Sequence, residues 1–137
     1  MSPRTALAAL ILAGGLASPT AAEPPAGLMQ HWQLSRIGDA AAAFPATLDL
    51  RDMPQVAGQA PCNRWFATVT LSGTGQGAPA ALQFGPIGAT RMACADLAAE
   101  QAYLQALAAV SAAQLDAGAL ILTGADGLRL EFQPLLP

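Results

Sequence analysis

Short runs in which apolar and polar residues alternate recur along this chain, and they constrain its fold more than any other feature. The clearest is residues 65–72 (WFATVTLS), where Trp65 and Val69 fall on one face while Thr68 and Thr70 fall on the other. Successive side chains of a strand point to opposite faces, so each run predicts a strand with one buried face. Clusters of glycine and proline separate the runs and predict turns. We therefore expect a mainly antiparallel sheet.

Six strands are expected in this sheet. Leu48 and Leu50 alternate with polar neighbours, so both should face the core. The pair Asp126-Gly127 lies in a loop of about four residues between two alternating runs, which predicts a hairpin. Residues 54–61 are expected to form an irregular loop. The expected strands cover residues 28–37, 47–51, 65–72, 81–84, 119–123 and 128–132.

The large aromatic side chains are candidates for the core of this sheet. Their alternative role is to line a cavity for an apolar ligand. A sheet of this size must close on itself or cover its edges, because unpaired edges promote aggregation. The aromatic residues expected inside are Trp32, Trp65, Phe66 and Phe84.

One helix is expected, from about Asp96 to Gln114. Asp96 can cap the amides of the first turn, and Glu100 suits the positive end of the helix dipole. Gly118 is expected to end the element. Six strands and one helix define an α+β domain dominated by antiparallel sheet. The apolar stripe of the helix is expected to contain Leu97, Leu104, Leu107 and Val110.

The first 22 residues have the order of a secretory signal peptide. A short basic start precedes an apolar stretch, and small residues with a proline follow, which predicts cleavage before Glu23. The apolar stretch, about 11 residues, is shorter than the roughly 20 residues that a membrane-spanning helix needs. No cysteine lies near the cut, so a lipid anchor is not expected. The predicted product is periplasmic or secreted and not inserted in the membrane, with a flexible linker at 23–27 and one domain at 28–137.

The charge of the expected product excludes some classes of partner. It contains five arginines, no lysine and nine acidic residues, hence a net charge of −4. The arginines are scattered singly along the chain. Nucleic acid and anionic membrane surfaces attract clustered positive charge, so neither is an expected partner. We expect a monomer.

Cys62 and Cys94 are the only cysteines. An even pair in an exported chain is typical of one disulfide, and buried free thiols are the alternative. Redox chemistry is not favoured, because no Cys-x-x-Cys motif lowers a thiol pKa. A zinc site would need two more ligands, and His31 is the only histidine. We expect neither a metal nor a cofactor.

The single histidine also limits catalysis. A Ser-His-Asp or Cys-His system would have to use His31, which lies beside Trp32 near the start of the domain. No glycine-rich phosphate loop follows a strand and opens a helix. We therefore expect no catalytic residues, and the protein is not expected to be an enzyme.

Two blocks around the cysteines carry a more specific signal. They read PCNRWFATV at residues 61–69 and FGPIGATRMAC at residues 84–94. With Trp32-Gln33-Leu34 ahead of them and a helix and hairpin behind, they resemble the META-domain family, the HslJ-like heat-shock proteins of bacterial envelopes. Pro61 stands where this family usually has glycine. The resemblance covers nearly the whole expected product and implies a small, partly open β-barrel with one packed helix.

Four polar residues flank the two cysteines and form a candidate binding patch: Asn63, Arg64, Thr90 and Arg91. If the cysteines meet, the four gather at one end of the barrel. An arginine fork can hold a carboxylate in two places, so one interpretation is a recognition patch. In the other interpretation, Asn63 and Thr90 bond to loop backbone, and the arginines pair with surface acids such as Asp49, Asp52 or Asp96.

The predicted function follows from the resemblance and from the missing catalytic groups. We expect a non-enzymatic accessory or binding protein of the envelope, associated with envelope or heat stress, whose partner is an envelope protein or an apolar small molecule. One alternative is a carrier that holds an apolar ligand inside the barrel. Another is an inhibitor or chaperone-like partner of a secreted protein.

Overall fold

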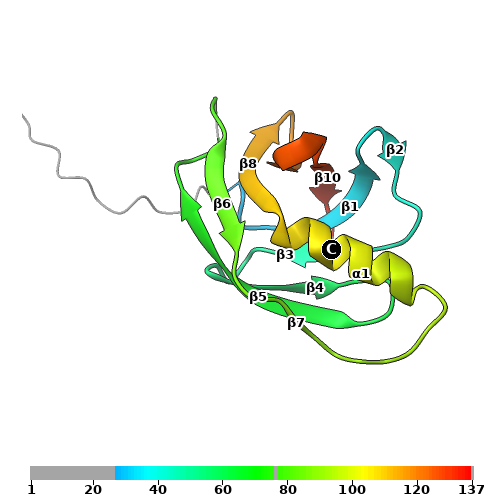
Figure 1. Cartoon of the computed structure of the whole chain (residues 1–137). Coiled ribbons are helices and arrows are strands. Elements are labelled where there is room, and N and C mark those ends of the chain that lie inside the picture. The colour runs from blue at the N-terminus through cyan, green and yellow to red at the C-terminus, as the bar shows by residue number, and fades with distance from the viewer. Residues whose placement is uncertain (1–26, 76, 137) are drawn as a thin grey trace, which may run out of the picture.

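A computed structural model describes residues 27–75 and 77–136 of the chain. The expected signal peptide at 1–22, and the linker up to residue 26, lie outside the described residues. In the described part, ten strands pair into one antiparallel sheet, and the single helix α1 packs against it (Figure 1). The elements are β1 His31–Ile37, β2 Ala40–Ala41, β3 Thr47–Asp49, β4 Gln55–Gln59, β5 Arg64–Ser72, β6 Ala80–Phe84, β7 Gly88–Ala89, α1 Leu97–Ala108, β8 Val110–Asp116, β9 Ala119–Gly124, the short 3-10 helix η1 Ala125–Gly127 and β10 Arg129–Pro134.

The sheet closes into a barrel of eight strands. Its order is β10-β9-β8-β6-β5-β4-β3-β1, and β1 then pairs with β10, for example at Leu34↔Phe132. β2 pairs with the C-terminal end of β1, and β7 pairs with β5. The expected α+β barrel with one helix is confirmed. Its closure is complete through β1 and β10 rather than partial.

Side chains fill the interior of this barrel. The alternation along β1 and β5 has the expected phase, since Trp32 and Trp65 are fully buried. Phe84 is also buried, and its ring meets the edge of Trp65. Phe66 was wrongly expected in the core. It follows Trp65 in the strand and therefore points to the opposite face, where 59% of it is exposed.

The helix is shorter than expected. It ends at Ala108, and residues 110–116 form strand β8 instead, which pairs with β9 from Val110↔Gly124 to Asp116↔Ala119. Alanine dominates this region and has a high helix propensity, but pairing within the barrel overrides local propensity. Gly118 does not end the helix. It has a φ of +86° in the turn between β8 and β9.

Strand β4 occupies most of the segment expected to be an irregular loop. Val56 points inward and is buried, but the neighbouring alanine, glycine and glutamine residues hide the alternation. Gly58 is required here, because the carbonyl of Thr47 and the indole of Trp65 occupy the space that a Cβ would need. The expected number of six strands was therefore too low, since β2, β4, β7 and β8 were not among them.

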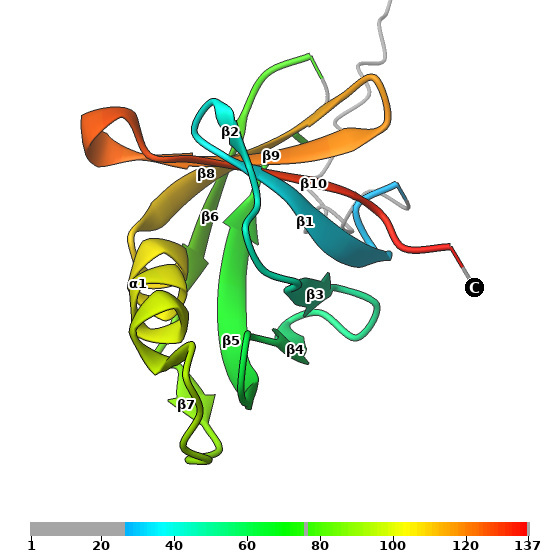
Figure 2. The ribbon, with the colours of Figure 1, turned by 90° about the vertical axis from the view of Figure 1, so that its right-hand side faces the viewer.

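β6 and β8 pair at two positions, Ala80↔Ala113 and Ala81↔Ala112, and helix α1 packs against β6 beyond this short pairing (Figure 2). In Figure 2 it lies beside β6, and its N-terminal end lies close to β7. Tyr103 and Leu107 are buried, and the ring of Phe44 meets the edge of Tyr103 at 5.7 Å between centroids. Within the described residues, no helix has the length and hydropathy needed to cross a membrane.

Candidate functional site

A disulfide joins Cys62, just before β5, to Cys94, in the connection between β7 and α1. The two Cα atoms are 6.1 Å apart, and 32 positions separate the residues in sequence. Cys94 is exposed and Cys62 is half-buried. The bridge therefore fastens a surface loop, residues 90–96, to the start of a long barrel strand.

Glu100 reinforces this attachment from the first turns of α1. One carboxylate oxygen, Oε1, accepts hydrogen bonds from the backbone amides of Cys62 (2.8 Å) and Asn63 (2.7 Å). The other oxygen, Oε2, accepts from the side-chain amide of Asn63 at 2.5 Å. Only 3% of Glu100 and 1% of Asn63 is exposed. The helix and the start of β5 are thus held together by a buried, charge-assisted cluster.

The remaining polar atoms of Asn63 hold the loop after β7. Its Oδ1 accepts from the amide of Met92 (2.6 Å) and from the hydroxyl of Thr90 (3.0 Å). Its Nδ2 also donates to the carbonyl of Met92 at 3.3 Å. The Thr90 hydroxyl in turn accepts from the amide of Arg64. Asn63 and Thr90 are therefore used in bonding this loop, which agrees with the structural interpretation of these two residues.

The environment of Glu100 lowers its pKa. Burial acts to raise the pKa, but the hydrogen bonds from the Asn63 side chain and from the amides of Cys62 and Asn63 outweigh it. Glu100 is therefore a buried carboxylate at neutral pH. Asp96, which was expected to cap the helix, makes no side-chain hydrogen bond to the first turn.

The arginines differ in how they are paired. Arg51 forms an ion pair with Asp49 at 2.8 Å, and its hydrogen bond lowers the Asp49 pKa to about 2. Arg129 pairs with Glu131, and Arg36 donates to a backbone carbonyl. Arg64 and Arg91 are exposed and form no ion pair with any described residue. The pairing of these two with Asp49, Asp52 or Asp96 is not observed.

The four predicted patch residues do not form one surface. Arg91 lines a groove together with Asn63 and Thr90, whereas Arg64 lines a different pocket beside His31. Arg64 lies on the outer face of β5, opposite Gln59 of β4. Asn63 and Thr90, which lie next to the cysteines in sequence, both bond to the loop. Their position in the sequence did not predict that Arg64 and Arg91 line different pockets.

The groove that contains Arg91 lies between residues 87–93 and one face of helix α1, and we call it the β7–α1 groove. Its volume is about 530 Å³. Met92 is 64% exposed and Leu97 is 36% exposed, both large apolar side chains at this surface. The apolar residues that line the groove are Ile87, Ala89, Met92, Ala93, Leu97 and Leu104.

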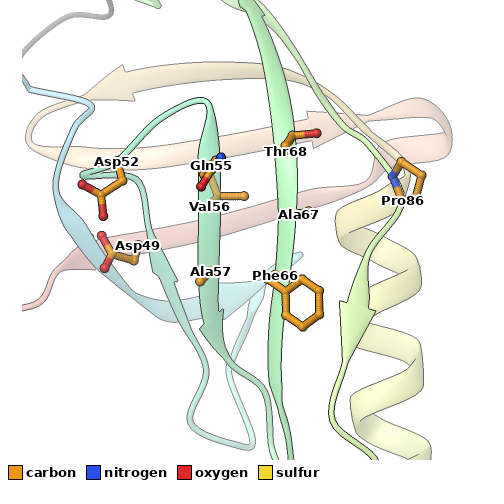
Figure 3. Close-up of a pocket in the computed structure, with 9 residues that line it drawn as sticks. All are labelled: Asp49, Asp52, Gln55, Val56, Ala57, Phe66, Ala67, Thr68 and Pro86. Carbon is orange, nitrogen blue, oxygen red and sulfur yellow. The ribbon is translucent and has the colours of Figure 1, made fainter.

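A second pocket of about 460 Å³ lies on the outer face of β4 and β5 (Figure 3). The exposed ring of Phe66 stands at one side of it, and Asp49 and Asp52 stand at the other. The ring covers Gly88, where a Cβ would collide with it. Asp49 is already paired with Arg51. Asp52 forms no ion pair with any described residue, so this pocket carries an unpaired negative charge, whereas the β7–α1 groove carries the positive charge of Arg91.

The sequence interpretation missed the role of Glu100. Glu100 lies three positions before Tyr103 and seven before Leu107, and these offsets place all three on one helix face. Because the other two are buried, this spacing is a signal that Glu100 is buried too. Met92 was missed because nothing in its immediate sequence distinguishes an exposed apolar side chain from a buried one.

Fold and site together define a small closed β-barrel with one helix, in which a disulfide and a buried Asn–Glu pair hold the loop before the helix. The META domain family model matches residues 26–135, so the chain belongs to the META domain family, as the sequence blocks predicted. An NMR structure of a protein from Burkholderia xenovorans is similar, with a TM-score of 0.60 and 26% sequence identity. The match covers 93% of this chain and 100% of that one. No curated protein matches the chain.

Proposed function

We propose that this protein is an exported, non-enzymatic accessory protein of the cell envelope that binds a segment of another envelope protein in the β7–α1 groove. The observation that carries the proposal is the exposure of Met92 and Leu97 beside the unpaired Arg91. Apolar side chains exposed beside a polar rim mark interaction surfaces. The disulfide and Asn63 hold this loop in place, which lowers the entropy cost of binding.

The proposal involves no reaction at this site. Asn63 and Glu100 are the buried polar side chains that line the groove, and both use their polar atoms to hold the loop. Because these polar atoms are already hydrogen-bonded within the protein, the groove is better suited to binding than to catalysis. The association with heat or envelope stress is part of the proposal and rests on the family resemblance alone.

Transport of an apolar ligand inside the barrel has less support. Trp32, Trp65 and Phe132 are fully buried and fill the interior together with the leucines of neighbouring strands. An apolar ligand of the groove itself, or an inhibitory contact with a secreted protein, would use the same exposed Met92. The experiment therefore first tests whether the groove is needed for function, and crosslinking then identifies the molecule that it binds.

The test compares two exposed apolar residues in a bacterial strain that lacks the gene. Met92→Asp changes the groove, and Phe66→Asp changes the outer pocket at a site of similar exposure, 64% against 59%. We expect Met92→Asp to abolish photo-crosslinking to a partner from position 93 and to lose complementation under envelope stress, while Phe66→Asp retains both. Full complementation by Met92→Asp with failure of Phe66→Asp would move the site to the outer pocket. An intact mass showing residues 1–22 retained would contradict export.

A further inference from the structure

Among the described strands, β7 pairs with β5 alone, so its other edge is free of strand pairing there. It pairs with β5 through Trp65↔Ala89 and Phe66↔Gly88, and the amide of Thr90 donates to the carbonyl of Arg64 at 3.0 Å. Hydrogen-bonded and non-hydrogen-bonded positions alternate along an antiparallel pair. Because Thr90 directs its amide toward β5, Ala89 directs its own amide and carbonyl away from β5. Ala89 lines the β7–α1 groove, so these backbone groups lie at its edge.

A helix face forms the opposite wall of the groove. Leu97, Gln101 and Leu104 are spaced by four and three positions, so they lie on one face of α1. A strand edge on one side and a helix face on the other is the arrangement in which an extended peptide gains backbone hydrogen bonds from the strand and places alternate side chains between the two walls.

The charges at the groove favour an acidic residue in the occupant. Arg91 is exposed and has no ion-pair partner among the described residues. Glu100 also lines the groove, but it is 3% exposed, and both its oxygens accept hydrogen bonds from residues 62 and 63. Among the described residues Arg91 has no carboxylate partner, so a carboxylate of a bound molecule would complement its charge.

From these observations we infer that the groove binds an extended peptide segment with alternating apolar residues, which adds as a strand to the free edge of β7 and places a carboxylate against Arg91. This inference rests on the proposed function, since it names the chemistry of the partner that the groove binds. A second copy of this chain, or a lipid, is a different occupant, and the tests below separate them.

The first test selects peptides from a display library of random octapeptides on the purified, disulfide-bonded protein. We expect the selected sequences to alternate apolar residues and to contain Asp or Glu. The variant Arg91→Glu should select Lys or Arg at the same position, because the charge that it presents is reversed. The matched variant Arg64→Glu should select the same acidic peptides as the wild type. Selection of acidic peptides by Arg91→Glu would overturn the inference.

The second test examines the backbone. One selected peptide is synthesised with N-methyl groups at single amides along its length. Methylation of the amides that face β7 should weaken binding at least about tenfold, whereas methylation of the intervening amides should leave it unchanged. We therefore expect the effect of methylation on affinity to alternate from one residue of the peptide to the next. We also expect peptide binding to change the chemical shift of the Ala89 amide. Equal affinities for all the methylated peptides would overturn the strand addition.

The outcomes for the inference and for the proposed function are distinguishable. If no peptide is selected, or if native mass spectrometry shows a dimer or a bound lipid in the groove, the inference fails. The proposed function still stands in the first case if Met92→Asp loses crosslinking to an envelope protein in cells. If Met92→Asp complements fully, the proposed function fails whatever the peptide results.

Discussion

Asn63 is the residue on which the geometry of the candidate site depends. Its side chain bonds to the loop at Thr90 and Met92 and to Glu100 of the helix, so three segments meet at one amide. Every one of these contacts is buried or partly buried, where an unpaired polar group is costly. The position of the exposed Met92 and Arg91 therefore depends on two polar residues that are themselves almost completely buried, Asn63 and Glu100.

Replacing Glu100 with Gln tests this cluster. The variant keeps the shape of the side chain but places an NH₂ group against donor amides, so we expect a loss of about 2–4 kcal/mol in the free energy of unfolding. The folded-state pKa of Glu100 is lowered from its ordinary value of 4.5. The stabilisation by the carboxylate is therefore complete above that value and is lost as the pH falls through the lowered pKa.

Urea unfolding of wild type and Glu100→Gln over a series of pH values measures this effect. The difference between the two proteins should be constant near neutral pH and should shrink below about pH 4.5. Asp49, whose pKa is also lowered, is present in both proteins, so its contribution cancels. A difference that stays constant through the acid range would contradict the buried carboxylate.

For single residues, the sequence predicted which side chains lie near the cysteines better than it predicted to which face each side chain points. The polar neighbours of the cysteines were identified from their position alone, and Asn63, Thr90 and Arg91 do lie together. Arg64 immediately precedes the buried Trp65 in β5, so its side chain lies on the outer face of that strand and lines another pocket. Helix spacing signals that Glu100 is buried, but its hydrogen-bond partners are amides 37 and 38 positions earlier in the chain, and local sequence patterns do not encode that contact.

At the scale of elements, helix α1 shows that sequence patterns can predict one end of an element and miss the other. Its start was predicted within one residue, because Asp96 stands before the apolar stripe and Glu100 falls in the first turn, although Asp96 makes no capping hydrogen bond. Its end was not, because residues 108–113 contain four alanines, which carry almost no pattern. Strand β8 forms there because β9 and β6 offer edges on both sides, which is a property of the assembled barrel.

The buried face of α1 gives a prediction for the stability of the fold. Leu107 is fully buried, so Leu107→Ala should lower the free energy of unfolding by roughly 2–5 kcal/mol. Gln105→Ala, on the exposed face of the same helix, should change it by less than about 0.5 kcal/mol. Leu104 is only half-buried and should give an intermediate value. Denaturant midpoints of the three variants measure this, and equal losses would mean that the helix face is assigned wrongly.

The disulfide gives a prediction that links the loop to the groove. Closing a loop of this length contributes roughly 3–4 kcal/mol in the chain-entropy estimate, so reduction should lower stability by about that amount. The barrel should remain folded, because its strands pair without the bridge. Urea unfolding with and without a reductant measures the loss. Two thiols alkylated in the unfolded protein before any reduction would show instead that the bridge is absent.

At the scale of the whole molecule, closure of the barrel joins parts of the chain that no local pattern connects. β1 and β10 lie near opposite ends of the described chain and pair along five positions. The sequence predicted most of the strands and the requirement that a sheet of this size protect its edges, and the family resemblance predicted a barrel. Neither predicted how β7 and α1 meet at one end. The β7–α1 groove arises from that meeting, so only the structure could show it.

Arg64 and Arg91, which form no ion pair with any described residue, are expected to differ in their importance for binding. Because Arg91 lines the groove and Arg64 lines another pocket, Arg91→Ala should lose partner capture and complementation, while Arg64→Ala should retain both. Neither change should lower the thermal midpoint by more than a small amount, since exposed charges without buried contacts contribute about 0–1 kcal/mol. The double variant should then behave like Arg91→Ala alone. If both single variants lose function equally, the two arginines act as one patch despite facing different pockets, and the binding surface must extend across the outer face of β5 from one pocket to the other.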